Sequence, residues 1–124
     1  MPKILVVDDE EAIRRFLTKF LEKKKYTVLT ASNGLEAVEL ARQEKPQMVL
    51  LDMYMPHMGG LEALAAIKKE NEALGVIVIT GVNDEKLGRA ALRMGAFDYI
   101  TKPFDLEHLE KVLWWKLKLI EEVC

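Results

Sequence analysis

The 124-residue sequence has few of the features that mark secreted, membrane-bound or nucleic-acid-binding proteins. Cys124 is the only cysteine, so no internal disulfide can form, and its terminal position argues against a buried cysteine nucleophile. No apolar run approaches the roughly 18–20 residues that a membrane-spanning helix needs. The formal net charge of −2 is too balanced to indicate a surface for nucleic acid or a membrane.

Targeting and linker segments are missing as well. The first three residues, Met1-Pro2-Lys3, lead directly into an apolar run without the pattern of a signal peptide. There is no low-complexity stretch, and half of the residues are hydrophobic while 31% are charged. We therefore expect one globular domain over residues 1–124, located in the cytoplasm and long enough to bury a core.

Short apolar runs alternate with segments of helical periodicity along the whole chain. The runs predict strands over residues 4–7, 27–31, 48–51, 76–79 and 97–101. The periodic segments predict helices over about 12–25, 33–44, 61–71, 84–94 and 105–122. Asn33, with Glu36 three residues later, is typical of a helix start, and Asp105 is expected to cap the last helix.

Five consecutive strand–helix units predict an α/β fold with helices on both faces of a parallel sheet. Right-handed crossovers leave few topologies for such a series. We expect a doubly wound, flavodoxin-like sheet with strand order 2-1-3-4-5. Ligands of this fold bind outside the carboxyl ends of the strands, where the first and third strands diverge.

Three carboxylates are expected at that point, because Asp8 and Asp9 end the first strand and Asp52 ends the third. Any one of them could be a helix cap or the start of a turn. Three converging carboxylates repel one another unless a cation or a proton compensates. Their oxygen atoms suit Mg²⁺, whereas the acidic stretch "VVDDEEA" lacks the glycines and amide donors of a phosphate-binding loop.

A hydroxyl and an ammonium follow the remaining two strands. Thr80 ends the strand in "VIVITG", and Lys102 ends the strand in "DYITKPF". Taken alone, the threonine would be an ordinary strand residue and the lysine a solvated charge. Together with acidic metal ligands they form a site suited to a phosphoryl group in transfer.

The sequence resembles the receiver domain of two-component response regulators over almost its whole length. The resemblance rests on "ILVVDDE", "VLLDMYMPHMGG", "VIVITG" and "AFDYITKPF", in that order and spacing. It implies that Asp52 is the phosphoacceptor. It also implies that Asp9 binds Mg²⁺ directly and Asp8 through water, with Asp52 and the backbone carbonyl of Tyr54 as further ligands.

The same resemblance assigns the other site residues and the partners. Thr80 and Lys102 would contact the phosphoryl oxygens, Thr80 and Tyr99 would form the switch, and the peptide bond before Pro103 would be cis. A histidine kinase would donate the phosphoryl group. The receiver could act through an output domain of a longer regulator, a downstream protein, or a homodimer formed by the fourth helix, fifth strand and fifth helix.

The last helix carries two tryptophans whose place is less clear. Its apolar stripe consists of Leu109, Val112, Leu113, Leu117 and Ile120. At about 100° per residue, Trp114 falls well off this stripe, while Trp115 and Leu119 flank it. Two interpretations stay open: a wide core stripe with one exposed indole, or a surface for a partner.

The predicted function is a phosphorylation-dependent signalling switch, which is no enzyme beyond its own phosphorylation and slow dephosphorylation. One alternative is an aspartate-nucleophile phosphatase of the haloacid-dehalogenase type, but such enzymes need a second acid where Tyr54 stands. Another is a receiver-like interaction module not controlled by phosphate. Such a module would be marked by loss of the acids, the threonine or the lysine, and all of these are present.

Overall fold

The computed structural model describes residues 2–54, 59–81, 84–102 and 105–123, with side chains described as far as residue 119. The strands are β1 (Lys3–Val7), β2 (Thr27–Ala31), β3 (Met48–Asp52), β4 (Gly75–Thr80) and β5 (Asp98–Thr101). The helices are α1 (Glu11–Lys23), α2 (Gly34–Glu44), α3 (Gly60–Glu70), α4 (Glu85–Arg93) and α5 (Leu106–Val123). Every predicted element is present, with ends shifted by only a few residues.

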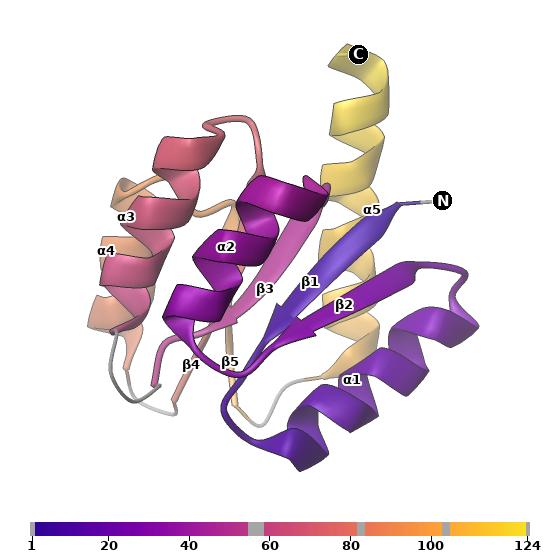
Figure 1. Ribbon diagram of the computed structural model, residues 1–124, viewed down its shortest axis with the longest axis horizontal. Coiled ribbons are helices and arrows are strands. Elements are labelled where there is room, and N and C mark those ends of the chain that lie inside the picture. Colours follow the sequence, from indigo (N-terminus) through magenta and orange to yellow (C-terminus); the bar gives the residue numbers. More distant parts are fainter. Residues whose placement is uncertain (1, 55–58, 82–83, 103–104, 124) are drawn as a thin grey trace.

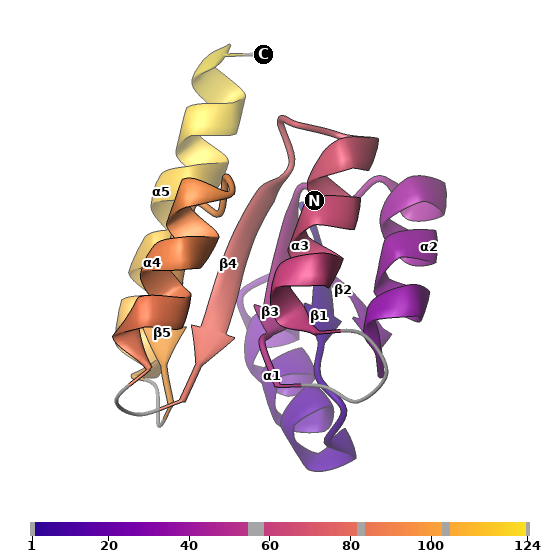
Figure 2. The same cartoon turned by 90° about the vertical axis from the view of Figure 1, so that its left-hand side faces the viewer.

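The five strands form one parallel sheet in the order β2-β1-β3-β4-β5, which confirms the predicted topology. Val7 at the end of β1 pairs with both Ala31 in β2 and Leu51 in β3. Thr80 at the end of β4 pairs with Thr101 at the end of β5. All five carboxyl ends therefore lie along one edge of the sheet, toward the bottom of Figure 2.

Helices cover both faces of the sheet, so β3 and β4 are buried along their whole length. Figure 1 shows α1 and α5 on one face and α2, α3 and α4 on the other. Each face has its own apolar cluster, built from alternate residues of the same strands. This burial on both faces explains why β3 and β4 appear in the sequence as continuous apolar runs.

The two predicted helix caps, Asn33 and Asp105, are confirmed. The Asn33 side chain accepts a 2.8 Å hydrogen bond from the Glu36 N–H, and the Asp105 carboxylate accepts one of 2.9 Å from Glu107. Helix α1, for which no cap was predicted, starts after Glu10, whose side chain makes no capping hydrogen bond. The turn between β1 and α1 must therefore be held in another way.

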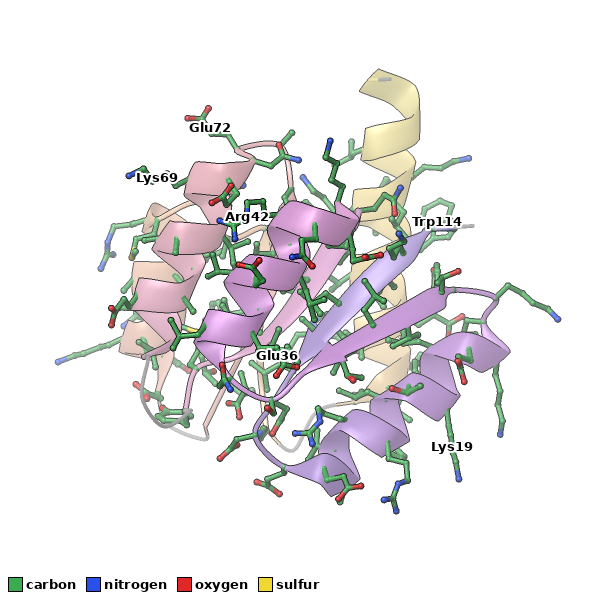
Figure 3. All side chains as sticks on the ribbon, in the orientation of Figure 1. Lys19, Glu36, Arg42, Lys69, Glu72 and Trp114 are labelled. Carbon is green, nitrogen blue, oxygen red and sulfur yellow. The ribbon has the colours of Figure 1, made fainter. Side chains whose placement is uncertain are left out.

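Both tryptophans of α5 are exposed, so the interpretation with a single exposed indole was wrong. The predicted stripe residues Leu109, Val112, Leu113 and Leu117 are buried, and Ile120 lies outside the described side chains. Trp114 is 51% exposed and Trp115 59%, with their ring centroids 5.2 Å apart in an edge-on arrangement. Figure 3 shows the Trp114 side chain extending to the right of α5. Among the described residues, no helix is long and apolar enough to span a membrane.

Candidate functional site

Two of the predicted carboxylates are buried side by side at the carboxyl edge of the sheet. Asp8 follows β1 and Asp52 ends β3, and the two strands pair up to Val7 and Leu51. Each aspartate is only 1% exposed. A carboxylate at this depth is stable as an anion only if a cation or hydrogen-bond donors compensate for lost water.

Lys102 is the cation that reaches both of them. Its Nζ lies 3.7 Å from Asp8 Oδ2 and 3.6 Å from Asp52 Oδ2. Its backbone N–H donates a 2.8 Å hydrogen bond to the carbonyl of Thr80, which anchors the residue after β5 to the end of β4. The structure thus brings Asp8, Asp52 and Lys102 together, as the sequence predicted.

One ammonium group does not balance two buried carboxylates. Burial and the charge of Asp8 raise the pKa of Asp52 to about 7, although the Lys102 ammonium opposes this shift. Burial also raises the pKa of Asp8, against a hydrogen bond from Glu10 and the charge of Lys102. Near neutral pH a proton on Asp52 therefore partly relieves the repulsion, and a further cation beside the two carboxylates would favour the ionised form.

The residues beside Asp8 fit a hard divalent cation. Carboxylate oxygens of Asp8, Asp9 and Glu10 lie within 4.8 Å of one another, with Asp9 and Glu10 exposed. Asp8 Oδ2 is buried and has no hydrogen-bond partner among the described residues. An all-oxygen set with open access is the kind of site that Mg²⁺ occupies while keeping several of its waters. Sequence reasoning did not single out Glu10, although it directly follows the two predicted ligands.

Asp52 also organises the chain that follows it. Its Oδ1 accepts a 3.1 Å hydrogen bond from the Tyr54 N–H, so the Tyr54 backbone is held close to the carboxylate. The Tyr54 ring is 47% exposed and reaches the end of β4, where a Cβ on Gly81 would lie 3.4 Å from it. The Tyr54 side chain therefore extends from the end of β3 to the end of β4.

Thr80 contributes a buried hydroxyl to the same edge of the sheet. The residue is fully buried, and within the described ranges its Oγ1 makes no hydrogen bond. A buried hydroxyl left unpaired costs roughly 1–3 kcal/mol, so such groups are uncommon in folded proteins. Its position at the carboxyl edge makes it a donor available to an incoming oxygen.

Tyr99, the predicted switch residue, packs against α4 at a glycine. A Cβ on Gly88 would lie 2.5 Å from Tyr99 Cδ2, so the ring occupies space that any other residue would fill. Tyr99 is partly buried beside the apolar cluster of that sheet face. Gly88 was not predicted as a site residue, although a glycine inside a helix is itself a signal of close packing. Pro103, predicted to follow a cis peptide bond, lies outside the described residues.

Residues 4–113 match the family model described as "Response regulator receiver domain", and the chain belongs to that family. It is 44% identical over 115 residues to protein PilH of Pseudomonas aeruginosa, covering 91% of this chain and 95% of that protein. It is 36% identical to sporulation initiation phosphotransferase F of Bacillus subtilis, with 86% of each covered. A receiver domain from Clostridium thermocellum superimposes with a TM-score of 0.95 at 31% identity, covering 100% of both chains.

Membership defines the class of function. Receiver domains belong to response regulators of two-component signal transduction, where they act with histidine kinases and output domains. They are signalling modules rather than classical enzymes, and they generally bind Mg²⁺ at an acidic pocket. This argues against the haloacid-dehalogenase alternative and agrees with the acidic cluster at Asp8, Asp9 and Glu10.

The raised pKa of Asp52 predicts a pH-dependent effect of Asp52→Asn in metal-free protein. Between the unfolded-state pKa of about 4 and the folded-state value, only the unfolded state ionises, so wild-type stability falls as pH rises. Replacing Asp52 with asparagine removes this loss of stability, because the amide does not ionise. We expect the stability gained by Asp52→Asn to be larger at pH 8 than at pH 5, by about 2 kcal/mol. Urea unfolding in a chelating buffer measures it, and equal gains at both pH values would contradict the assignment.

The contact between Gly88 and Tyr99 predicts a change of sign in a double-mutant cycle. Glycine to alanine inside a helix ordinarily stabilises by roughly 0.5–1 kcal/mol. Here the added methyl group meets the Tyr99 ring. We expect Gly88→Ala to destabilise the wild type but to stabilise the Tyr99→Ala variant, as measured by urea unfolding of all four proteins. If Gly88→Ala changed the free energy of unfolding with the same sign in both backgrounds, the Tyr99 ring would not require a glycine at position 88.

Proposed function

We propose that this receiver domain is a phosphorylation-dependent switch in which Asp52 accepts a phosphoryl group from a histidine kinase in the presence of Mg²⁺. The observation that supports this best is the placement of Asp52, a buried carboxylate held between Asp8 and the Lys102 ammonium. A module not controlled by phosphate would have no use for this costly arrangement. The buried Thr80 hydroxyl, which has no hydrogen-bond partner within the described ranges, supports the same conclusion.

In the proposed reaction, a carboxylate oxygen of Asp52 attacks phosphorus. The bond between phosphorus and the kinase's imidazole nitrogen breaks, and an acyl phosphate forms on Asp52. Attack requires an ionised Asp52, which a pKa near 7 makes only partly available on its own. Mg²⁺ held by Asp8, Asp9 and Asp52, with the Tyr54 carbonyl, would offset the carboxylate repulsion and the charge on the phosphoryl oxygens.

Two further residues supply donors to the transferred group. Lys102 Nζ already lies within 3.6 Å of an Asp52 oxygen, so it would remain close to a phosphoryl group attached there. The Thr80 hydroxyl has no partner to give up among the described residues. Both would form charge-assisted hydrogen bonds to phosphoryl oxygens, which are stronger than neutral ones.

The response would pass from Thr80 to Tyr99 through neighbouring strands. Thr80 pairs with Thr101, two residues after Tyr99, so the side chains of Thr80 and Tyr99 project from the same sheet face. The helices that precede and follow β5 carry exposed apolar side chains on what would be a face of α4, β5 and α5. These are Leu92 near the end of α4, Met94 just after it, and Trp115 and Leu119 on α5. We assign this face to partner binding, with a second copy of the chain as one partner.

The phosphosite assignment predicts a mass change that depends on one residue. Incubation of the protein with Mg²⁺ and acetyl phosphate should add one phosphoryl group, whereas Asp52→Asn should remain unmodified because an amide is a poor nucleophile. Intact-mass spectrometry measures the product directly. A matched control is Asp84→Asn, since the Asp84 side chain makes no capping hydrogen bond to α4. Labelling of Asp52→Asn to the same extent as this control would contradict the proposal.

The position of Tyr54 predicts slow loss of the phosphoryl group. Hydrolysis needs a water in line with the bond between Asp52 and phosphorus, and Tyr54, whose backbone N–H binds the Asp52 carboxylate, would bring a bulky ring near that path and no carboxylate to orient the water. We expect Tyr54→Asn to speed decay by roughly ten-fold, about 1.4 kcal/mol of barrier. Tyr54→Phe keeps the ring and should decay like the wild type. Decay is followed after removal of the phosphodonor at fixed Mg²⁺, and equal rates in all three proteins would show that the ring provides no shield.

A further inference from the structure

Arg14 of α1 reaches back to the acidic turn at the end of β1. Its Nη1 donates a 2.5 Å hydrogen bond to the backbone carbonyl of Asp8, six residues earlier. The Arg14 side chain is only partly exposed, and within the described ranges it forms no ion pair with a carboxylate. The guanidinium thus approaches the acidic cluster but binds a neutral carbonyl.

The electrostatics of α1 do not account for this placement. Arg14 lies near the start of the helix, where the macrodipole is positive and a cation is unfavourable. The neighbouring Arg15 shows the ordinary arrangement, in which an exposed guanidinium pairs at 2.8 Å with Glu11 one turn earlier. The two arginines are adjacent and carry the same charge, yet only Arg14 contacts the turn.

The turn needs such a contact, because α1 has no side-chain cap from Glu10. Asp8 is instead fixed at three atoms. Its N–H donates to Ala31 in β2 at 3.1 Å, and its Oδ1 accepts from the Glu10 N–H at 2.9 Å. Its carbonyl accepts from Arg14. These contacts hold all of Asp8 except Oδ2, the atom that lies 3.7 Å from Lys102.

We propose that Arg14 is a positioning residue for the cation site, holding the turn of residues 8–10 so that its carboxylates converge. The inference rests on the proposed function, since it concerns the Mg²⁺ site of that reaction. Arg14 acts through the Asp8 backbone and leaves the carboxylate oxygens free. An arginine that paired directly with those oxygens would compete with the metal ion.

The effect of removing Arg14 on Mg²⁺ affinity has opposite signs depending on whether the residue acts by positioning the ligands or only by its charge. As a charge alone, the guanidinium repels a divalent cation, so Arg14→Gln would bind Mg²⁺ more tightly. As a positioning group it restrains the ligands, so the same variant binds Mg²⁺ more weakly. Loss of a group that orients metal ligands typically lowers metal affinity about 10–100-fold.

The test measures Mg²⁺ binding to metal-free protein by calorimetry at low ionic strength, in wild type, Arg14→Gln and Arg15→Gln. Arg15→Gln is the matched control, because it removes the same charge from the same helix without touching the turn. We expect Arg14→Gln to bind about ten-fold more weakly than Arg15→Gln. Equal or tighter binding by Arg14→Gln overturns the inference. Failure of the wild type to bind Mg²⁺ overturns the proposed metal site itself.

A second measurement does not depend on the metal. In metal-free protein, amide hydrogen exchange at Glu10 reports the hydrogen bond to Asp8 Oδ1. We expect faster exchange at Glu10 in Arg14→Gln than in Arg15→Gln, with Arg14→Lys intermediate because it keeps a donor and the charge. Unchanged exchange in Arg14→Gln would show that the turn holds its shape without the guanidinium.

Discussion

The ammonium of Lys102 between the carboxylates of Asp8 and Asp52 is the interaction on which the site depends. Three separate segments of the chain must meet for it to form. A parallel sheet provides this meeting, because the ends of β1, β3 and β5 share one edge even though β4 separates β5 from β3. The hydrogen bond from the Lys102 N–H to the Thr80 carbonyl ties the end of β5 to β4, and the Lys102 side chain extends past β4 to Asp52 and Asp8. The order of the strands is therefore a condition of the chemistry.

The buried polar groups of the site lower the stability of the folded protein, and apolar burial elsewhere in the fold compensates for this loss. Asp52 carries a raised pKa, and Thr80 Oγ1 and Asp8 Oδ2 are buried without hydrogen-bond partners in the described part of the chain. Each is a group that folding would otherwise satisfy or expose. The two apolar clusters on either face of the sheet offset this cost. Unsatisfied polar groups kept together at one sheet edge are typical of a site that awaits a ligand.

The sequence predicted what depends on local pattern and on topology. Periodicity located every strand and helix, and the caps at Asn33 and Asp105 were correct. The convergence of Asp8, Asp52 and Lys102 followed from the strand order alone. The contact of Arg14 with Asp8 and that of Gly88 with Tyr99 could not be predicted, because each depends on how a helix sits against another segment. The exposure of Trp115 could not be decided from the sequence for the same reason, since the width of a buried helix face is set by its neighbours.

The proposed switch follows from the imbalance of charge in the resting site. A phosphoryl group on Asp52 would add negative charge and three acceptor oxygens at the sheet edge that carries the Lys102 ammonium and the Thr80 hydroxyl. Lys102 already lies close to Asp52, whereas the Thr80 hydroxyl has no hydrogen-bond partner in the described part of the chain. The larger rearrangement is therefore expected at Thr80. Thr80 and Tyr99 share one sheet face on adjacent strands, and the Tyr99 ring rests on a helix position without a Cβ. In the proposed switch, a rearrangement at Thr80 would therefore reach the contact of α4 with β5 through Tyr99 on the adjacent strand.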